Sequence, residues 1–439
     1  MKIAIAGTGY VGLVTAVCLA HKGHTVTCVD VNETKIKMLQ SGKSPIYEKD
    51  LEDLMQQHAE RLTYTTDYQN AYKDAEVIFI GVGTPEKKDG SANLTYVYES
   101  AKQIAQSAEK NCIIVVKSTV PIGTNDKVEV ILQKEKVHDV TLEVASNPEF
   151  LAQGTAVRDT LYASRIVLGV ESKHAENVLR EVYAGFEAPV LVTNRRSAEM
   201  IKYASNDFLA LKISYVNEIA NLCELVGADI QDVTAGMGLD PRIGNQFLNA
   251  GIGYGGSCFP KDTKALHWLA NFHDYEIKTV KAAIEVNEQQ KLKLFKKSRK
   301  YYESLSGLTV AVLGLTFKPG TDDLREAPSL VTVPVMLDDG AIIHAWDPAG
   351  IENFKKEMER YQENDLNRIH YFATPQEAVK NADICFIFTE WPEVKAMQPE
   401  DFMQMKTTII LDGRNCFLQE DMKQIDMVYE SIGREVIKV

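Results

Sequence analysis

The sequence predicts an α/β protein made of two doubly wound parallel sheets that are joined by a long central helix and a helical middle region. Three observations point to this class. Short apolar runs alternate with helical patterns through residues 1–196, one long amphipathic pattern follows, and the strand–helix alternation restarts after residue 304. We therefore expect three domains, at residues 1–196, 197–303 and 304–439.

The first domain opens with a strand and a helix. Lys2–Ala6 is a short apolar run of the kind that forms a buried parallel strand, and the helical pattern Leu13–His21 ends at Gly23. The same reasoning predicts further strands at Thr25–Val29, Val77–Val82, Ile113–Lys117, Leu142–Ala145, Ile166–Val170 and Val190–Val192, with helices near Thr95–Ala108, Asp126–Gln133 and His174–Tyr183.

The middle domain is predicted to be helical. Apolar residues recur every three or four positions through Ser197–Val226, and Gly227 ends the pattern. Such a helix would span about 45 Å, which is long enough to join two domains and to offer a surface to a second subunit. A second helical block is expected at about Glu276–Tyr302. The strands expected in the last domain are Leu308–Leu313, Ile342–Ala345, Ile384–Phe388 and Ile409–Leu411.

Composition excludes several classes of protein. The chain has 439 residues, 45% hydrophobic content and a formal net charge of −13, which is typical of a globular protein and argues against a nucleic-acid binder. No apolar run reaches the roughly 20 residues that span a bilayer, and no signal peptide is visible. Seven cysteines without CxxC spacing suit a reducing cytoplasm. The histidines show no metal-binding spacing, so we expect no metal site.

A glycine-rich turn follows the first strand. Gly7, Gly9 and Gly12 form G-x-G-x-x-G, in which the glycines permit a tight turn, a close approach to a pyrophosphate and close helix packing. Asp30 ends the next strand, 18 residues after Gly12, where a carboxylate accepts hydrogen bonds from a ribose diol and repels a 2′-phosphate. This context favours NAD over NADP; the alternative is a glycine-rich turn without a ligand.

A cysteine lies in the segment GGSCFPKD at residues 255–262. A thiolate beside a nicotinamide can add to an aldehyde, and the hemithioacetal can then lose a second hydride and become a thioester that water hydrolyses. Lys261 lies near Cys258 in the sequence and would favour the thiolate. The alternative interpretation is an inert buried cysteine.

Other polar residues occupy positions that suit a site. Lys202 and Asn206 are four residues apart and share one face of the long helix, although solvated polar residues are the ordinary reading of that spacing. The segments 81–85, 117–119 and 147–150 follow strand ends, where ligands bind in open α/β sheets. In the last domain the cations that follow strand ends are Lys318, Arg325 and Arg414.

Taken together, these segments resemble the UDP-glucose 6-dehydrogenase family, within the nucleotide-sugar dehydrogenases, and the resemblance runs nearly end to end. The matching segments are GTGYVGL at 7–13, GVGTP at 81–85, KSTVPIGT at 117–124, NPEFLAQGTA at 147–156, IKYASNDFLALKISYVNE at 201–218, RIGNQFLNAGIGYGGSCFPKD at 242–262, FKPGTDDLRE at 317–326 and DGRN at 412–415. RIGNQFL favours UDP-glucose over GDP-mannose or N-acetylated sugars.

The resemblance implies two Rossmann-like domains and a role for each matching residue. Catalytic roles fall on Cys258 as nucleophile, on Lys202 and Asn206 as oxyanion stabilisers, on Asp262 at the hydrolytic water, and on Thr119 and Glu149 in proton handling. The residues implied to contact NAD are Gly7, Gly9, Tyr10, Val11, Gly12, Asp30, Lys35, Thr84, Thr119, Lys261 and Arg325. Those implied to bind the sugar nucleotide are Glu149, Phe150, Leu151, Lys202, Asn206, Arg242, Phe247, Leu248, Asn249, Ala250, Gly251, Gly255, Cys258, Phe317, Lys318 and Arg414.

The implied activity is the NAD-dependent, four-electron oxidation of UDP-glucose to UDP-glucuronate, a precursor in polysaccharide biosynthesis, with two NAD reduced per sugar. A homodimer is also implied, because Arg242 resembles an arginine that reaches a neighbouring subunit's substrate. The expected location is the cytoplasm. Two positions depart from the family: Gln153 stands where many members have a glutamate, and Asn249 replaces a lysine of animal members. The alternatives are the same chemistry on UDP-N-acetylmannosamine, GDP-mannose or UDP-galactose, and an NAD-binding scaffold without activity.

Overall fold

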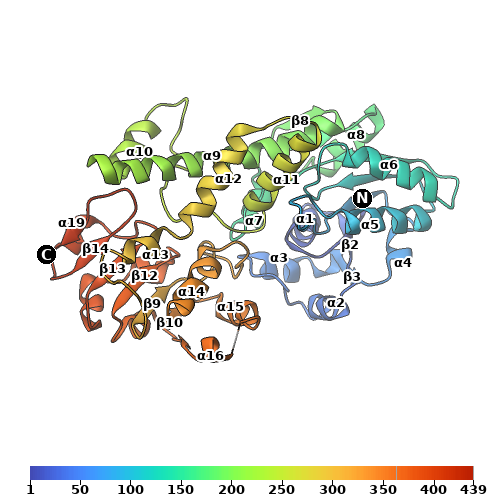
Figure 1. Ribbon diagram of the computed structural model, residues 1–439. Coiled ribbons are helices and arrows are strands. Elements are labelled where there is room, and N and C mark those ends of the chain that lie inside the picture. Colours follow the sequence, from blue (N-terminus) through green and yellow to red (C-terminus); the bar gives the residue numbers. More distant parts are fainter. Residues whose placement is uncertain (362, 439) are drawn as a thin grey trace. The chain divides into compact units, whose positions relative to one another are not determined.

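The computed structural model describes residues 1–361 and 363–438, which form two compact units (Figure 1). The first unit comprises residues 1–205 and 268–273, and the second comprises residues 206–267 and those from 274 onward. Each unit contains one mainly parallel sheet with helices on both faces. The predicted fold class, two Rossmann-like α/β units joined by helices, is therefore confirmed.

The first unit alternates strands and helices from its first residues. Its elements are β1 (Lys2–Ala6), α1 (Tyr10–His21), β2 (Thr25–Val29), α2 (Glu33–Gln40), α3 (Leu51–Gln57), β3 (Leu62–Thr65), α4 (Tyr68–Tyr72), β4 (Val77–Ile80), α5 (Thr95–Ser107), β5 (Cys112–Val116), α6 (Thr124–Glu135), β6 (Leu142–Ser146), α7 (Ala156–Leu161), β7 (Ile166–Gly169), α8 (Lys173–Val182) and β8 (Val190–Thr193).

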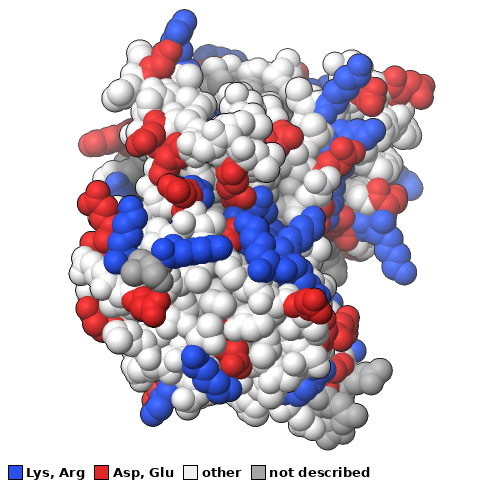
Figure 2. Space-filling view, turned by 60° about the vertical axis from the view of Figure 1, so that its left-hand side comes forward, with Lys and Arg blue, Asp and Glu red and all other residues white. Residues whose placement is uncertain are grey.

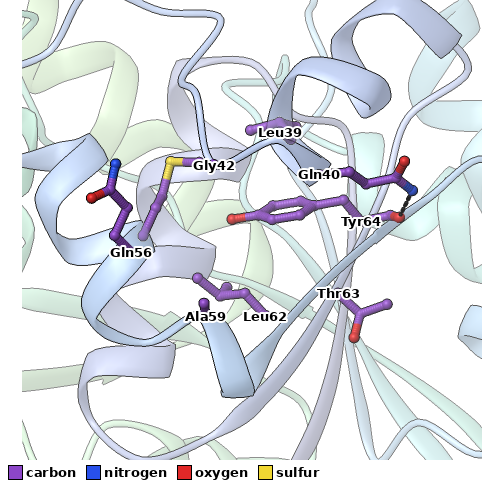
Figure 3. Close-up of a pocket in the computed structure, with 9 residues that line it drawn as sticks. Leu39, Gln40, Gly42, Gln56, Ala59, Leu62, Thr63 and Tyr64 are labelled. Atoms are coloured by element: carbon purple, nitrogen blue, oxygen red, sulfur yellow. Dashed lines mark hydrogen bonds between the residues drawn. The ribbon is translucent and has the colours of Figure 1, made fainter.

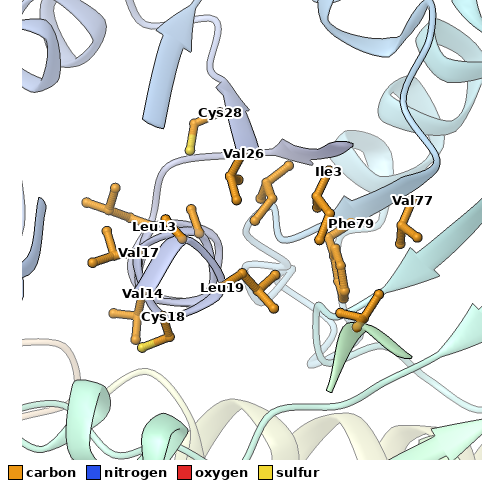
Figure 4. Close-up of a cluster of buried hydrophobic side chains, with 14 of the residues drawn as sticks. Ile3, Leu13, Val14, Val17, Cys18, Leu19, Val26, Cys28, Val77 and Phe79 are labelled. Carbon is orange, nitrogen blue, oxygen red and sulfur yellow. The ribbon is translucent and has the colours of Figure 1, made fainter. Parts of the chain in front are cut away.

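The sheet of the first unit has the strand order β3-β2-β1-β4-β5-β6-β7-β8. Successive residues of β1 face opposite layers: Ile3 and Ile5 pack with α1 and α8, whereas Ala4 and Ala6 pack with α5 and α6. Figure 4 shows the first of these layers, in which Leu19 of α1 points toward the strand residue Phe79, while Leu13 and Val17 lie on the other side of the helix. Strands buried on both faces have continuous apolar sequences, which is why β1 and β2 were predicted to the residue.

The second unit begins with helices and ends with a sheet. The long helix α9 (Arg195–Val226) starts in the first unit and continues into the second, and α11 (Phe259–Phe272) ends in the first. The other elements are α10 (Ile230–Gly238), α12 (Lys278–Gln290), α13 (Lys293–Ser298), β9 (Thr309–Leu313), α14 (Pro328–Asp338), β10 (Ile342–Trp346), α15 (Ile351–Met358), α16 (Glu363–Leu366), β11 (Ile369–Tyr371), α17 (Pro375–Val379), β12 (Ile384–Ile387), α18 (Pro392–Lys395), β13 (Ile409–Asp412), α19 (Gln419–Met422), β14 (Val428–Glu430) and β15 (Ile437–Lys438).

The second sheet repeats the pattern of the first, in the order β11-β10-β9-β12-β13-β14-β15. On one face, Val310 and Val312 of β9 pack with residues of α9, α13, α14 and α15. On the other face, Ala311 and Leu313 pack with residues of α17 and α18. Both units thus bury a sheet between two layers, which leaves the loops at the strand ends to carry polar residues.

Some details differ from the predictions. The helical block expected at about Glu276–Tyr302 is two helices, α12 and α13, and the chain turns between them, where the buried ammonium of Lys291 binds Glu326 at 2.6 Å. That contact comes from a distant segment, so the helical period could not reveal it. The sheets are also not wholly parallel, since β7 pairs antiparallel to β6 and β15 antiparallel to β14.

Candidate functional site

The glycine turn between β1 and α1 is a backbone cradle. Gly7 has φ +96°, and a Cβ on Gly12 would lie 2.0 Å from the Gly7 carbonyl oxygen, so packing alone requires both glycines. Gly9 is different, because a Cβ there would meet no atom within 4 Å. No described side chain caps the N-terminus of α1. Open space at Gly9 beside an uncapped helix N-terminus fits a bound pyrophosphate.

Asp30 lies at the end of β2, next to this turn. Its carboxylate accepts hydrogen bonds from the Thr8 amide at 2.9 Å, the Thr8 hydroxyl at 2.6 Å and the Asn32 amide at 2.9 Å. Burial alone would raise the pKa of Asp30, but these hydrogen bonds outweigh it and the pKa lies below its usual value. An ionised carboxylate held in this way fits the ribose diol of NAD.

The other predicted NAD contacts of the first unit surround the same strand ends. Thr84 donates its hydroxyl to the Thr119 carbonyl at 2.9 Å, which joins the segments after β4 and β5. Tyr10 donates to the Tyr47 carbonyl at 2.5 Å. Lys35 lies in the first turn of α2, and Val11 lies in the first turn of α1.

A buried charged cluster lies in the first unit near the end of β6. The Lys202 ammonium on α9 is 3.1 Å from the Glu149 carboxylate, and the two side chains are only 3% and 5% exposed. Glu149 also accepts a hydrogen bond from the Leu151 amide at 2.8 Å, and the Lys202 nitrogen lies 5.3 Å from the Phe150 ring centre. Two predicted site residues after β6, Glu149 and Phe150, therefore lie next to Lys202.

Lys117 and Asn147 lie in the strand-end segments that the sequence singled out, but no role was predicted for either residue or for Tyr183. The Lys117 ammonium donates to the Asn147 side chain at 2.9 Å, and Asn147 also accepts from the Tyr183 hydroxyl at 2.5 Å. Burial lowers the pKa of Lys117 to about 8; Glu149 opposes this change and Lys202 adds to it. The position of Lys117 at the end of a predicted strand was the sequence feature that pointed to it. No sequence pattern places Tyr183 near Lys117 or Asn147.

Cys258 lies in the second unit, directly before α11. Its carbonyl accepts the Asp262 amide at 2.8 Å, and its sulfur is 3.7 Å from the Ser257 hydroxyl. The side chain is half-buried, as is that of Cys416, whereas the other five cysteines are buried. The N-terminus of an α-helix carries partial positive charge, which favours a thiolate at this place.

Asp262 connects the cysteine segment to the long helix. Its carboxylate accepts the Asn206 amide at 2.7 Å and the Lys261 ammonium at 2.6 Å, and the side chain is 1% exposed. Three predicted residues therefore meet one turn of helix from Cys258. The arrangement places a buried, hydrogen-bonded carboxyl group one helical turn from the thiol.

The glycine-rich loop before Cys258 is held by amide side chains that were not predicted. Asn217 on α9 accepts the Gly251 amide at 2.8 Å, and Gln290 on α12 donates to the Gly251 carbonyl at 2.7 Å. Asn287 accepts the Tyr254 amide at 2.8 Å and donates to the Tyr254 carbonyl at 3.0 Å. These three residues lie inside helical patterns, where the sequence gives no sign of a loop partner.

The predicted cations of the second sheet lie around the same loop. Arg414 donates to the carbonyls of Gly253 at 3.1 Å and Phe388 at 2.8 Å. The Gly256 amide donates to the Arg325 carbonyl at 2.7 Å, and a Cβ on Gly255 would lie 2.6 Å from the Glu326 carbonyl oxygen.

Phe317 lies against the same loop, since a Cβ on Gly256 would lie 2.8 Å from its ring. The Lys318 ammonium lies 5.6 Å from the Phe317 ring centre. Substitution of Gly255 or Gly256 would therefore displace the segment that leads to Cys258.

The segment before the loop is more open. Arg242 is exposed and binds Asp240 at 2.6 Å, so it contacts none of the other predicted site residues through a hydrogen bond that the structure shows. Phe247 has φ +62° and its ring centre lies 6.2 Å from that of Phe259. Leu248 and Ala250 are buried, whereas Asn249 is exposed.

A pocket of about 510 Å³ lies on the first unit (Figure 3). Its lining residues come from α2, α3, β3 and the segments that follow the two helices, and are Leu39, Gln40, Gly42, Met55, Gln56, Ala59, Leu62, Thr63 and Tyr64. None of them was predicted to bind a ligand.

Positively charged side chains gather on one face of the molecule. Figure 2 shows one face on which several Lys and Arg side chains gather near the centre, with Asp and Glu around them. A chain of net charge −13 can thus still offer local positive charge to an anionic ligand.

Within residues 1–361 and 363–438, no group of three or more His, Cys, Asp or Glu is arranged to hold a metal ion. No helix in that part of the chain has the length and apolar character needed to cross a membrane.

Comparison with known proteins assigns the chain to a family. Residues 1–187 match the NAD binding domain of the UDP-glucose/GDP-mannose dehydrogenase family, residues 196–289 match its central domain, and residues 311–419 match its UDP binding domain. The chain is 44% identical over 440 residues to UDP-glucose 6-dehydrogenase YwqF of Bacillus subtilis (strain 168), covering 100% of this chain and 98% of the relative. It is 42% identical to UDP-glucose 6-dehydrogenase of Rickettsia prowazekii (strain Madrid E), covering 99% and 100%.

Solved structures agree with this assignment. A UDP-glucose dehydrogenase from the hyperthermophilic archaeon Pyrobaculum islandicum has a TM-score of 0.91 at 35% identity, covering 99% of this chain and 98% of that one. A UDP-D-ManNAc dehydrogenase from Pyrococcus horikoshii has a TM-score of 0.86 at 26% identity, covering 99% of both chains. The chain therefore belongs to the UDP-glucose/GDP-mannose dehydrogenase family, whose members are NAD-dependent oxidoreductases, and NAD is its cofactor.

Proposed function

We propose that this chain oxidises UDP-glucose to UDP-glucuronate and reduces two NAD per sugar through a thioester on Cys258. The observation that carries the proposal is the placement of a half-buried thiol at a helix N-terminus, one turn from the buried carboxylate of Asp262. The relatives named UDP-glucose 6-dehydrogenase cover essentially the whole chain, which supports UDP-glucose as the sugar. The UDP binding domain match over residues 311–419 supports a UDP-sugar.

The domain division proposed for this activity is residues 1–196 for NAD, 197–303 for the central helices, and 304–439 for the UDP-sugar. NAD, when bound, accepts the hydride in each oxidation. The residues proposed to hold it are those of the glycine cradle, Asp30 and the strand-end residues described above, together with Lys261 and Arg325. The cradle fits because Gly9 leaves open space that the protein does not fill itself.

The first oxidation removes a hydride from C6 of the sugar and a proton from its hydroxyl. Lys202 and Asn206 are proposed to stabilise the oxygen as negative charge develops on it. Glu149, which is bound to Lys202, and Thr119 are proposed to handle the proton. A buried ammonium–carboxylate pair can exchange a proton without exposing the reacting oxygen to water.

Cys258 then keeps the half-oxidised sugar in place. Its thiolate adds to the aldehyde carbon and forms a C–S bond, and the oxygen becomes the hydroxyl of a hemithioacetal. Loss of the second hydride and of the hydroxyl proton leaves the thioester. Asp262 takes a proton from water as the water oxygen attacks the thioester carbon, the C–S bond breaks, and the sulfur leaves as thiolate.

Exposed apolar side chains on α9 and directly after α10 support a homodimer. Phe208 is 61% exposed, Leu225 83% and Leu239 85%, and Arg242 follows soon after Leu239 in the sequence. Large exposed apolar side chains are a mark of interaction surfaces. We propose that a second copy covers these side chains and that Arg242 reaches the partner's substrate. All seven cysteines are free, which suits a reducing cytoplasm.

The deciding experiment is the ratio of NADH formed to UDP-glucose consumed. A ratio near two supports the double oxidation, and a ratio near one shows a reaction that ends at the aldehyde and leaves Cys258 without its assigned role. UDP-N-acetylmannosamine, GDP-mannose and UDP-galactose, assayed in parallel, test the choice of sugar. Absence of NADH with every sugar would favour a scaffold that kept the fold and lost the activity.

A further inference from the structure

The second unit buries a carboxyl group that the proposed mechanism does not use. Asp207 on α9 is 5% exposed, and neither of its carboxylate oxygens has a hydrogen-bond partner among the described residues. Its neighbour Phe208 is exposed, so Asp207 lies on the inner face of the helix, along which Ser214 and Asn217 are also buried. A buried carboxylate without hydrogen bonds costs several kcal/mol unless the group takes up a proton.

Its charged and titratable neighbours come from two segments. On α11, Asp262 and Lys261 act on Asp207 electrostatically, the first as a like charge and the second as an opposite charge. In the glycine-rich loop, the phenol of Tyr254 lies within electrostatic range of Asp207. Lys261 is already bound to Asp262 at 2.6 Å, and Asn206 occupies the other oxygen of Asp262 at 2.7 Å.

Asp262 and Asp207 differ in their hydrogen-bond partners. Asp262 has an ammonium and an amide donor as hydrogen-bond partners, whereas the Asp207 carboxyl has none among the described residues. Burial, and then the charge of Asp262, raise the pKa of Asp207 to about 8, while Lys261 opposes the change. Near neutral pH Asp207 is therefore a carboxylic acid, and its negative charge appears only as the solution becomes alkaline.

We propose that Asp207 is a positioning residue that keeps a proton beside Asp262, so that thioester hydrolysis proceeds with a single negative charge in this part of the site. The inference rests on the proposed function. Attack of water on the thioester builds negative charge on the carbonyl oxygen, and departure of Cys258 builds it on sulfur. Ionised Asp207 opposes both charges, whereas neutral Asp207 opposes neither.

The expected signature is a fall in turnover at alkaline pH. A single group of pKa about 8 is mostly protonated at pH 7 and mostly ionised at pH 9, so turnover at saturating UDP-glucose and NAD should drop roughly tenfold between those values. The Asp207→Asn variant keeps the shape of the neutral acid and cannot ionise. Its turnover should change less than about twofold over the same range.

Two variants serve as controls. Glu218→Gln removes an exposed carboxylate from the same helix and should keep the wild-type pH profile. Asp207→Glu restores an acid and should restore the alkaline fall if it folds. An alkaline fall that persists unchanged in Asp207→Asn assigns the titration to another group, such as Lys117, and overturns the proposal.

A second measurement does not depend on turnover. Infrared difference spectra of the protein without substrate should show a protonated carboxyl band that disappears as the pH passes through about 8, in wild type and in Glu218→Gln but not in Asp207→Asn. Absence of that band from wild type contradicts the inference even if turnover behaves as expected. If the proposed function is wrong, wild type yields no NADH while the band still titrates, so the two failures can be told apart.

Discussion

The side-chain amide of Asn206 donates a hydrogen bond to the carboxylate of Asp262 over 2.7 Å, which ties α9 to the first turn of α11. Both side chains are buried, and the remaining oxygen of Asp262 is bound by Lys261. The bond fixes the direction of the carboxylate next to Cys258, so its loss has a consequence both for stability and for chemistry.

Removal of this amide is predicted to destabilise the second unit. Asn206→Ala leaves a buried carboxylate oxygen without a donor and should lower the free energy of unfolding by about 1–3 kcal/mol. Urea denaturation followed by circular dichroism measures the change. Ser205→Ala, one residue away and not part of this bond, is the control. If both variants lose the same free energy of unfolding, the Asn206–Asp262 bond does not stabilise the protein as proposed.

The pair Lys202 and Glu149 should behave as a unit. Lys202→Met leaves the Glu149 carboxylate buried without its ammonium, and loss of one partner of a buried pair costs about 3–5 kcal/mol. Adding Glu149→Gln removes the orphaned charge and should recover much of the stability without recovering turnover. Urea denaturation and NADH production, measured on both single variants and the double variant, test this; strictly additive losses of stability would count against the pair.

Alanine substitutions at two glycines of the dinucleotide turn should have different effects, one on stability and one on NAD binding. Gly12→Ala places a Cβ 2.0 Å from the Gly7 carbonyl oxygen and should destabilise the first unit. Gly9→Ala meets no protein atom within 4 Å, so it should fold normally and yet bind NAD at least tenfold more weakly, since the methyl enters the space assigned to the pyrophosphate.

Thermal melts and NAD titration by fluorescence distinguish the two. Gly236→Ala, at a position in α10 where a Cβ also meets no atom within 4 Å, is the control for Gly9→Ala. Normal NAD binding by Gly9→Ala would show that the open space serves another purpose.

Cys258 should be the thiol that reacts first. Five of the seven cysteines are buried, and burial raises the pKa of Cys416 far above its ordinary value, with Asp412 and Glu390 adding to the effect. Iodoacetamide should therefore modify Cys258 before any other cysteine, and UDP-glucose should slow the reaction. Peptide mass spectrometry identifies the site, with Cys258→Ser and Cys416→Ser as the two reference variants. Faster labelling of Cys416 than of Cys258 would refute the expectation.

Stability should depend on pH through Asp207. Its pKa is about 8 in the folded chain and about 3.9 in an unfolded chain. Between these values the folded state binds the extra proton, so the contribution of Asp207 to stability falls as the pH rises and reaches its lowest level above about 8. Asp207→Asn should therefore raise the melting temperature more at pH 9 than at pH 5. An equal gain at both values would mean that the group does not titrate in this range.

Prediction from the sequence succeeded where one short segment carries the whole signal. The apolar run Lys2–Ala6 and the glycine turn after it are each encoded in consecutive residues. β1 lies as predicted, and α1 ends at His21 as predicted but begins at Tyr10 instead of Leu13. Edge strands such as Leu62–Thr65 were not predicted, because a half-exposed strand has no continuous apolar run.

Site prediction was limited for a related reason. Asp262 could be named because it lies near Cys258 in the chain. Asn217, Asn287 and Gln290 could not, since each contacts the glycine-rich loop from a helix at least 30 residues away. Asp207 stands in an apolar helical pattern, and only its surroundings show that it is buried without a partner.

The loop that leads to Cys258 is held by uncharged amide side chains. Asn217, Asn287 and Gln290 neither gain nor lose protons between strongly acidic and strongly alkaline solution, and salt hardly weakens their bonds. The scaffold under the nucleophile should thus keep its form across buffers in which the acids beside it change charge. Titration of this enzyme would then act on the acids beside the loop and leave these three amide contacts unchanged.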